Sequence, residues 1–119
     1  MVLVDTSVWV HHFRNDEPRL RHLLEHGQVL VHPFVVGELA CGRLRDRAEV
    51  LDLLGRLDPA ARASDDEAME LVEAKGLMGA GIGWVDVHLV ASCLLSRARL
   101  WTNDKALSRV ANRLGLTLN

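Results

Sequence analysis

The chain opens with residues 1–13, MVLVDTSVWVHHF, and the arrangement of the rest can be inferred from them. An apolar run, expected to be a short buried strand, leads directly into the carboxylate of Asp5. Thr6 and Ser7 follow, and then an apolar pattern typical of a helix. In an open α/β sheet, ligands bind in the crevice outside the carboxyl ends of the strands. We therefore expect Asp5 to lie at such a crevice.

Predicted strands and helices alternate along the rest of the sequence, which indicates a parallel sheet with helices on both faces. We expect an α/β fold of three α/β/α layers around a central sheet of four to five strands. Further strands are predicted at residues 28–31, about 60–63, 99–102 and 116–118. Helices are predicted to follow Asp5 and to begin near Pro18, Pro33, Glu49, Ser64, Trp84 and Asp104.

The length and composition are those of an ordinary globular domain. Of 119 residues, 49% are apolar and 25% charged, so residues 1–119 are expected to form one domain. The net charge of −2 excludes a polybasic coat for nucleic acid, but not an enzyme with local basic patches. Neither a secretory signal nor a membrane-spanning run is expected, which makes the cytoplasm the default compartment. Cys41 and Cys93 are interpreted as buried, reduced thiols.

Two acidic residues are predicted on helical faces that are otherwise apolar. Asp86 shares its face with Leu89, Val90 and Cys93, three, four and seven positions further on. Burying a bare carboxylate there is costly or raises its pKa, so a cation or a hydrogen-bond donor is expected beside it. Glu38 shows the same pattern more weakly.

Two other acids, Asp5 and Asp104, each follow a predicted strand and precede a predicted helix. Taken singly, ordinary roles remain open. Asp5 and Asp104 can be helix N-caps, a role worth about 1 kcal/mol. Asp86 can be a first-turn residue favoured by the helix dipole, and Glu38 the partner of an arginine.

The four acids together predict a metal site. Because the fold class brings strand ends and helix starts to one edge, the four carboxylates are expected to converge there. Converging carboxylates repel each other unless they share a divalent cation. An all-oxygen set without Cys or His favours Mg²⁺, or Mn²⁺, over zinc.

The remaining motifs have structural interpretations. Ser64 and Glu67 have the spacing of a capping box. Residues 79–83, GAGIG, lack the Gly-Lys-Ser/Thr ending of a P-loop and follow a helix, which predicts a flexible loop. The six histidines form no set with metal-ligand spacing and are interpreted as surface or packing residues. Ser7 has no nucleophile elbow around it.

Four motifs, in this order and spacing, are similar to those of one known family: VDTSVW from Val4, VVGELACG from Val35, WVDVHLVAS from Trp84 and WTNDKAL from Trp101. Together they resemble the PIN domain, and within it the VapC-type toxins of bacterial toxin–antitoxin pairs, over essentially the whole chain. The resemblance implies a PIN-like fold and a Mg²⁺-dependent endoribonuclease toxin. It also implies inhibition by a small VapB-type antitoxin, and usually a homodimer.

Carried over position by position, the family's acidic quartet falls on Asp5, Glu38, Asp86 and Asp104. Asp5 and Asp86 are expected to be the main metal ligands, Asp104 a direct or water-mediated one, and Glu38 a ligand of a second metal or the base that orients water. Side chains expected to hydrogen-bond these ligands are Thr6, Ser7 and Thr102. Candidates for contact with the RNA backbone are Arg43, Arg45 and Arg47, with a solvated charged surface as the alternative. One departure is Leu107, where many relatives carry an aromatic residue.

Two other functions remain open at this point. A metal-dependent phosphatase on a similar sheet would use Asp5 as nucleophile, but it normally has a second Asp where this chain has Ser7. A non-catalytic protein-binding module would be a degenerate relative, which the presence of all four acids argues against.

Overall fold

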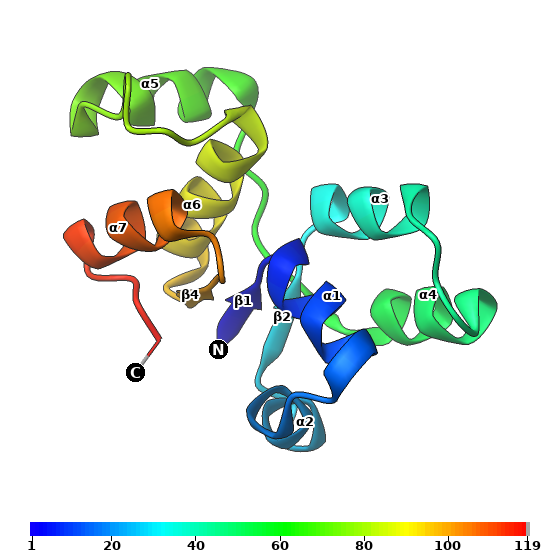
Figure 1. Ribbon diagram of the computed structural model, residues 1–119. Helices are drawn as coiled ribbons and strands as arrows, with labels where there is room; N and C mark the ends of the chain where they lie inside the picture. The colour runs from blue at the N-terminus through cyan, green and yellow to red at the C-terminus, as the bar shows by residue number, and fades with distance from the viewer. Residues whose placement is uncertain (119) are drawn as a thin grey trace.

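A computed structural model describes residues 1–118, which contain seven helices and four strands (Figure 1). The strands are β1 (Val2–Val4), β2 (Val29–Val31), β3 (Asp58–Pro59) and β4 (Arg99–Trp101). The helices are α1 (Thr6–Asn15), α2 (Pro18–Glu25), α3 (Pro33–Cys41), α4 (Arg47–Arg56), α5 (Asp65–Lys75), α6 (Trp84–Ser96) and α7 (Lys105–Arg113).

The strands form one parallel sheet in the order β3-β2-β1-β4. All three residues of β1 are buried, and Val4 pairs with Trp101 of β4. In Figure 1, α5, α6 and α7 lie on one side of the sheet, and α1, α3 and α4 on the other. The predicted three-layer α/β arrangement is therefore confirmed.

Two strands differ from the prediction. The third strand lies at residues 58–59 rather than 60–63, although the N–H of Ala60 still donates to Val31 O at 2.9 Å. Pro59 is tolerated there because β3 is an edge strand. The segment predicted as the last strand, 116–118, contributes a single parallel bridge between Leu100 and Thr117.

The core is built from the apolar faces of these elements. Trp9 of α1 is fully buried and stacks on Phe13, with ring centroids 5.7 Å apart. Leu107 is fully buried too, so the position that departs from the family pattern is filled by an ordinary core leucine. Cys93 is buried, which raises its pKa to about 12, but Cys41 is exposed. The prediction for Cys41 was wrong because this residue ends α3 and is not covered by the helices around it.

The sheet brings three strand ends to one edge, where β1 leads into α1, β2 into α3 and β4 into α7. Ser64 and Glu67 form the predicted capping box at the start of α5. Residues 79–83 belong to no helix or strand, which confirms the predicted loop, while its flexibility stays a prediction. None of the helices in residues 1–118 has the length and hydropathy needed to cross a membrane.

Candidate functional site

Asp5 is a buried carboxylate, 7% exposed, at the end of β1. Its Oδ1 accepts a hydrogen bond from the N–H of Thr6 at 2.8 Å. Its Oδ2 accepts from Ser7 Oγ at 2.9 Å and from Thr102 Oγ1 at 2.7 Å. Asp5 therefore caps α1, as the ordinary interpretation required, and is also held by a side chain from the far end of the sequence.

Two backbone N–H groups extend this network to Asp104. The N–H of Asn103 donates to Ser7 Oγ at 3.0 Å, and the N–H of Asp104 donates to Thr102 Oγ1 at 3.0 Å. Asp104 caps α7, where its Oδ1 accepts from the N–H of Leu107 at 2.8 Å. Hydrogen bonds thus tie the turn after β4 to the turn after β1, and Asp104 to Asp5.

Glu38 joins the group from α3. Its Oε1 accepts a hydrogen bond from Thr6 Oγ1 at 2.7 Å. Glu38 is exposed, so the predicted placement near an apolar stripe was only partly right. The buried residues of α3 are Val35 and Leu39, and Glu38 lies at the margin of the face they form.

Asp86, in the first turn of α6, is half-buried. Its Oδ2 accepts from the N–H of Gly83 at 3.2 Å, which is the compensating hydrogen bond that the sequence required. The pKa of Asp86 is nevertheless raised, first by burial and then by the negative charges of Asp5, Asp104 and Glu38. Asp5, Asp104 and Glu38 therefore lie close enough to Asp86 to act electrostatically on its carboxylate.

Asp5, Glu38, Asp86 and Asp104 together form the acidic group. Its carboxylate oxygens are ligands that suit a hard divalent cation. No Lys or Arg within residues 1–118 is ion-paired with any of the four acids. Over the same residues, Asp86 Oδ1 and Asp104 Oδ2 have no hydrogen-bond donor and remain available as ligands. The side chains do not themselves form a finished shell, since no three His, Cys, Asp or Glu side chains of residues 1–118 are gathered tightly enough to coordinate one ion.

Comparison with known proteins identifies the family. The model of the PIN domain matches residues 2–113. The chain belongs to the PIN-domain family. It is 43% identical over 119 residues to Ribonuclease VapC32 of Mycobacterium tuberculosis, in strains CDC 1551 and H37Rv. The aligned region covers 99% of this chain and 96% of that protein. A solved structure, PAE2754 from Pyrobaculum aerophilum, shares the fold with a TM-score of 0.64 and 15% identity, covering 96% of this chain and 94% of that one.

Basic residues of this PIN domain lie beside Glu38. A cavity of about 430 Å³ is lined by Glu38 and by the side chains of Arg14, Arg43 and Arg45, together with apolar residues of α1 and α3. Arg47, the third member of the predicted basic cluster, has a different environment. Its guanidinium donates to the carbonyls of Ala40 at 2.6 Å and Gly42 at 3.5 Å, which fixes the chain where α3 ends.

The two buried histidines, His32 and His88, have packing roles in the structure. His32 is 1% exposed and caps α3, where its Nδ1 accepts from the N–H of Phe34 at 3.0 Å. His88 is 3% exposed and lies against the rings of Phe34 and Trp84, with centroids 5.1 and 4.7 Å away. His88 Nε2 lies 3.3 Å from Asp65 Oδ1. No histidine of residues 1–118 belongs to the acidic group.

Sequence reasoning missed two contributors to the site. Gly83 supplies the N–H that Asp86 accepts, and the signal was present, because an acid three residues after a helix start has the spacing of a capping box. Arg14 lines the cavity beside Glu38 from α1, ten residues beyond the end of β1. Nothing in the local sequence distinguishes Arg14 from other exposed arginines, because α1 and α3 meet only in the fold.

Proposed function

We propose that this PIN domain is a Mg²⁺-dependent endoribonuclease toxin that hydrolyses RNA phosphodiester bonds at the acidic group. The observation that carries the proposal is the half-buried Asp86, whose pKa is raised by burial and by three other carboxylates, with no Lys or Arg of residues 1–118 paired to the group. Such a group favours a cation. The relatives named Ribonuclease VapC32 support RNA as the substrate.

In this proposal, Asp5, Asp86 and Asp104 hold the metal, and Glu38 holds a second metal or orients the attacking water. Mg²⁺ is the expected ion and Mn²⁺ a possible substitute. A divalent cation there would make the attacking water more acidic and neutralise charge on the phosphate oxygens.

The residues of the chain hold these carboxylates in place. Ser7 and Thr102 donate to Asp5 Oδ2, so its oxygen is fixed by two hydroxyls from opposite ends of the sequence. Thr6 donates to Glu38 and thereby links α3 to the start of α1. Hydrogen-bond partners of this kind restrict the orientation of metal-ligating side chains.

RNA is proposed to approach along the cavity beside Glu38. Arg43 and Arg45, with Arg14, offer cations for its backbone phosphates. Arg47 is proposed to brace the end of α3 rather than to contact RNA, because its guanidinium is engaged by two carbonyl oxygens.

The proposed partners follow from the family. A VapB-type antitoxin is expected to inhibit the enzyme. The chain is expected to act as a homodimer in the cytoplasm. Residues 1–119 are expected to form one domain, of which Asn119 lies outside the described residues. The large exposed side chains of Met78 and Trp84, 60% and 43% exposed, flank the glycine-rich loop and offer an apolar surface for the homodimer.

The test is cleavage of structured RNAs by the purified, antitoxin-free protein, with Mg²⁺ or with a chelator. We expect cleavage only with the metal, and a loss of at least about a hundredfold in Asp86→Asn and Asp5→Asn. Asp52→Asn, which removes an exposed acid of α4, is the matched control and should cleave normally. Undiminished cleavage by both site variants would reject the assignment. Hydrolysis of a phosphomonoester, with no RNA cleavage, would instead favour the phosphatase.

A further inference from the structure

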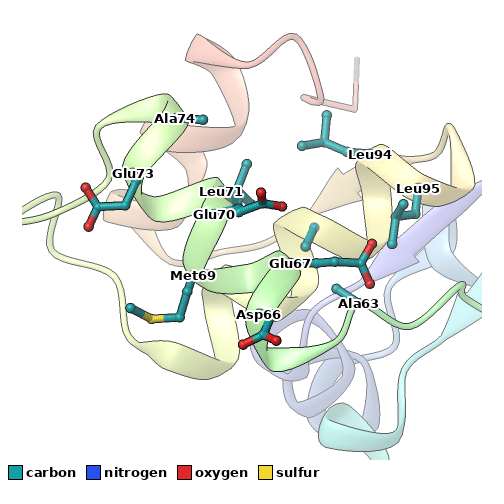
Figure 2. Close-up of a pocket in the computed structure, with 11 residues that line it drawn as sticks. Ala63, Asp66, Glu67, Met69, Glu70, Leu71, Glu73, Ala74, Leu94 and Leu95 are labelled. Carbon is teal, nitrogen blue, oxygen red and sulfur yellow. The ribbon is translucent and has the colours of Figure 1, made fainter.

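A cavity at the surface is separate from the acidic group. It has a volume of about 1030 Å³ and lies between α5 and α6 (Figure 2). Its apolar lining includes Met69 of α5 and Leu94 and Leu95 of α6, which are 51%, 40% and 49% exposed. Large apolar side chains gathered at that exposure are typical of an interaction site.

Acidic side chains surround this groove. Asp66, Glu67, Glu70 and Glu73 of α5 all line it, and no Lys or Arg does. Figure 2 shows Glu67 and Glu70 extending from α5 toward the part of α6 that carries Leu94 and Leu95. Within residues 1–118, no cation is ion-paired with any of these four acidic residues of α5.

Glu67 is held at the start of α5 by its capping box with Ser64. Its Oε1 accepts from the backbone N–H of Ser64 at 2.9 Å, and this bond, with the hydrogen bond to the Ser64 side chain, lowers the pKa of Glu67. The groove thus combines an apolar floor with a rim of acidic side chains.

We propose that this groove binds a cationic amphipathic helix of a partner protein. An apolar face of the helix would cover Met69, Leu94 and Leu95, and its flanking Lys or Arg side chains would meet the acidic rim. α5 has 11 residues, so the groove runs for about 16 Å, the length of about three helical turns. Apolar residues at i, i+3, i+4 and i+7 would face it.

A second copy of the chain does not suit the same groove. A symmetric dimer presents the same patch from both subunits, so α5 would bring its acidic rim against an identical rim. Like charges facing each other across an interface oppose association. The chain's own arginine-rich segment, 42–46, is a loop and not a helix.

Binding in this groove leaves the acidic group accessible. Asp86 lies in the first turn of α6, while Leu94 and Leu95 lie near its end, about 12 Å further along the axis. The inference therefore does not rest on the proposed nuclease function, and either can fail alone.

The experiment measures binding of a labelled synthetic peptide of about 15 residues, long enough to form a helix of several turns, by fluorescence anisotropy. The peptide carries leucines at i, i+3, i+4 and i+7 and lysines on both flanks; a second peptide carries glutamates in place of the lysines. We expect binding of the lysine peptide only, weakening as salt is added.

Variants of the intact protein locate the binding site. Leu95→Lys should weaken binding at least about tenfold, because it replaces an apolar side chain that lines the groove with a cation that repels the lysines of the peptide. Leu53→Lys changes a leucine of α4 that is 42% exposed and lies outside the groove, so its affinity should be unchanged. Circular dichroism should show that both variants are folded.

Three results would overturn the proposal. Equal binding of the lysine and glutamate peptides would show that the acidic rim does not select the partner. Unchanged binding by Leu95→Lys would place the peptide elsewhere. A shift of Leu95→Lys to a smaller species in sedimentation would show that a second copy occupies the groove.

Discussion

Asp5 shows how one residue serves two purposes. Its Oδ1 caps α1 through the N–H of Thr6, and its Oδ2 receives the hydroxyls of Ser7 and Thr102. The cap was foreseeable from the sequence, since Asp is a preferred residue at that position. The contact with Thr102 was not, because the two residues are 97 positions apart and meet only through the pairing of β1 with β4.

Thr102→Val should weaken the site without changing the fold. The valine keeps the shape of threonine but removes the hydroxyl that donates to Asp5 and accepts from the N–H of Asp104. We expect RNA cleavage and Mn²⁺ affinity to fall by about 10- to 100-fold. Thr102→Ser keeps the hydroxyl and serves as the control. Equal activity of the valine and serine variants would show that Thr102 only fills space.

The helices were predicted more reliably than the short strands. α5 has a capping box and acids at its start, so its sequence determines its boundary locally. β3 has only two residues, both exposed, and nothing in residues 58–63 marks which of them pair. Its position is set by the neighbouring β2, through Leu30 opposite Asp58 and Val31 opposite Pro59.

The start of α3 should make stability depend on pH. His32 caps this helix through a neutral Nδ1, and its buried Nε2 has no hydrogen-bond partner. Burial, followed by the charges of Arg62 and His88, lowers the pKa of His32 from 6.5 to about 4. The unfolded chain therefore binds the proton more readily, and stability is lost as the pH falls from 6.5 toward 4.

Urea denaturation as a function of pH measures this loss. At about 1.4 kcal/mol per pKa unit, His32 should account for roughly 3 kcal/mol between pH 6.5 and 4. His32→Asn retains a side-chain oxygen for the cap but does not titrate, so its stability should fall less steeply over the same range. Parallel pH profiles for the two proteins would contradict the role given to His32.

At the scale of the whole molecule, the sequence predicted the parallel sheet, its buried first strand and the four acids at one edge. It could not predict that Glu38 would be exposed or that Arg47 would turn back onto the carbonyls at the end of α3. Both depend on how α3 and α4 sit on the sheet. The groove between α5 and α6 was also out of reach, since it exists only where two helices pack together.

A metal bound at the acidic edge should stabilise the whole fold. A ligand that binds only the folded chain shifts the unfolding equilibrium by mass action. Millimolar Mg²⁺ should therefore raise the melting temperature by about 2 to 6 °C, and a chelator should reverse the change. NaCl at matched ionic strength controls for screening, and Asp86→Asn should abolish most of the shift. A similar rise with NaCl alone would attribute the effect to general charge screening.

The central claim is that Asp5, Asp86, Asp104 and Glu38 hold a divalent cation, and its most direct measurement is Mn²⁺ binding followed by electron paramagnetic resonance. Wild-type protein should bind Mn²⁺, with Mg²⁺ competing. Asp86→Asn keeps an oxygen that can accept from Gly83 but removes the charge, and should bind at least about tenfold more weakly, while Asp52→Asn should bind normally. Equal Mn²⁺ affinity in wild type, Asp86→Asn and Asp5→Asn would contradict the account.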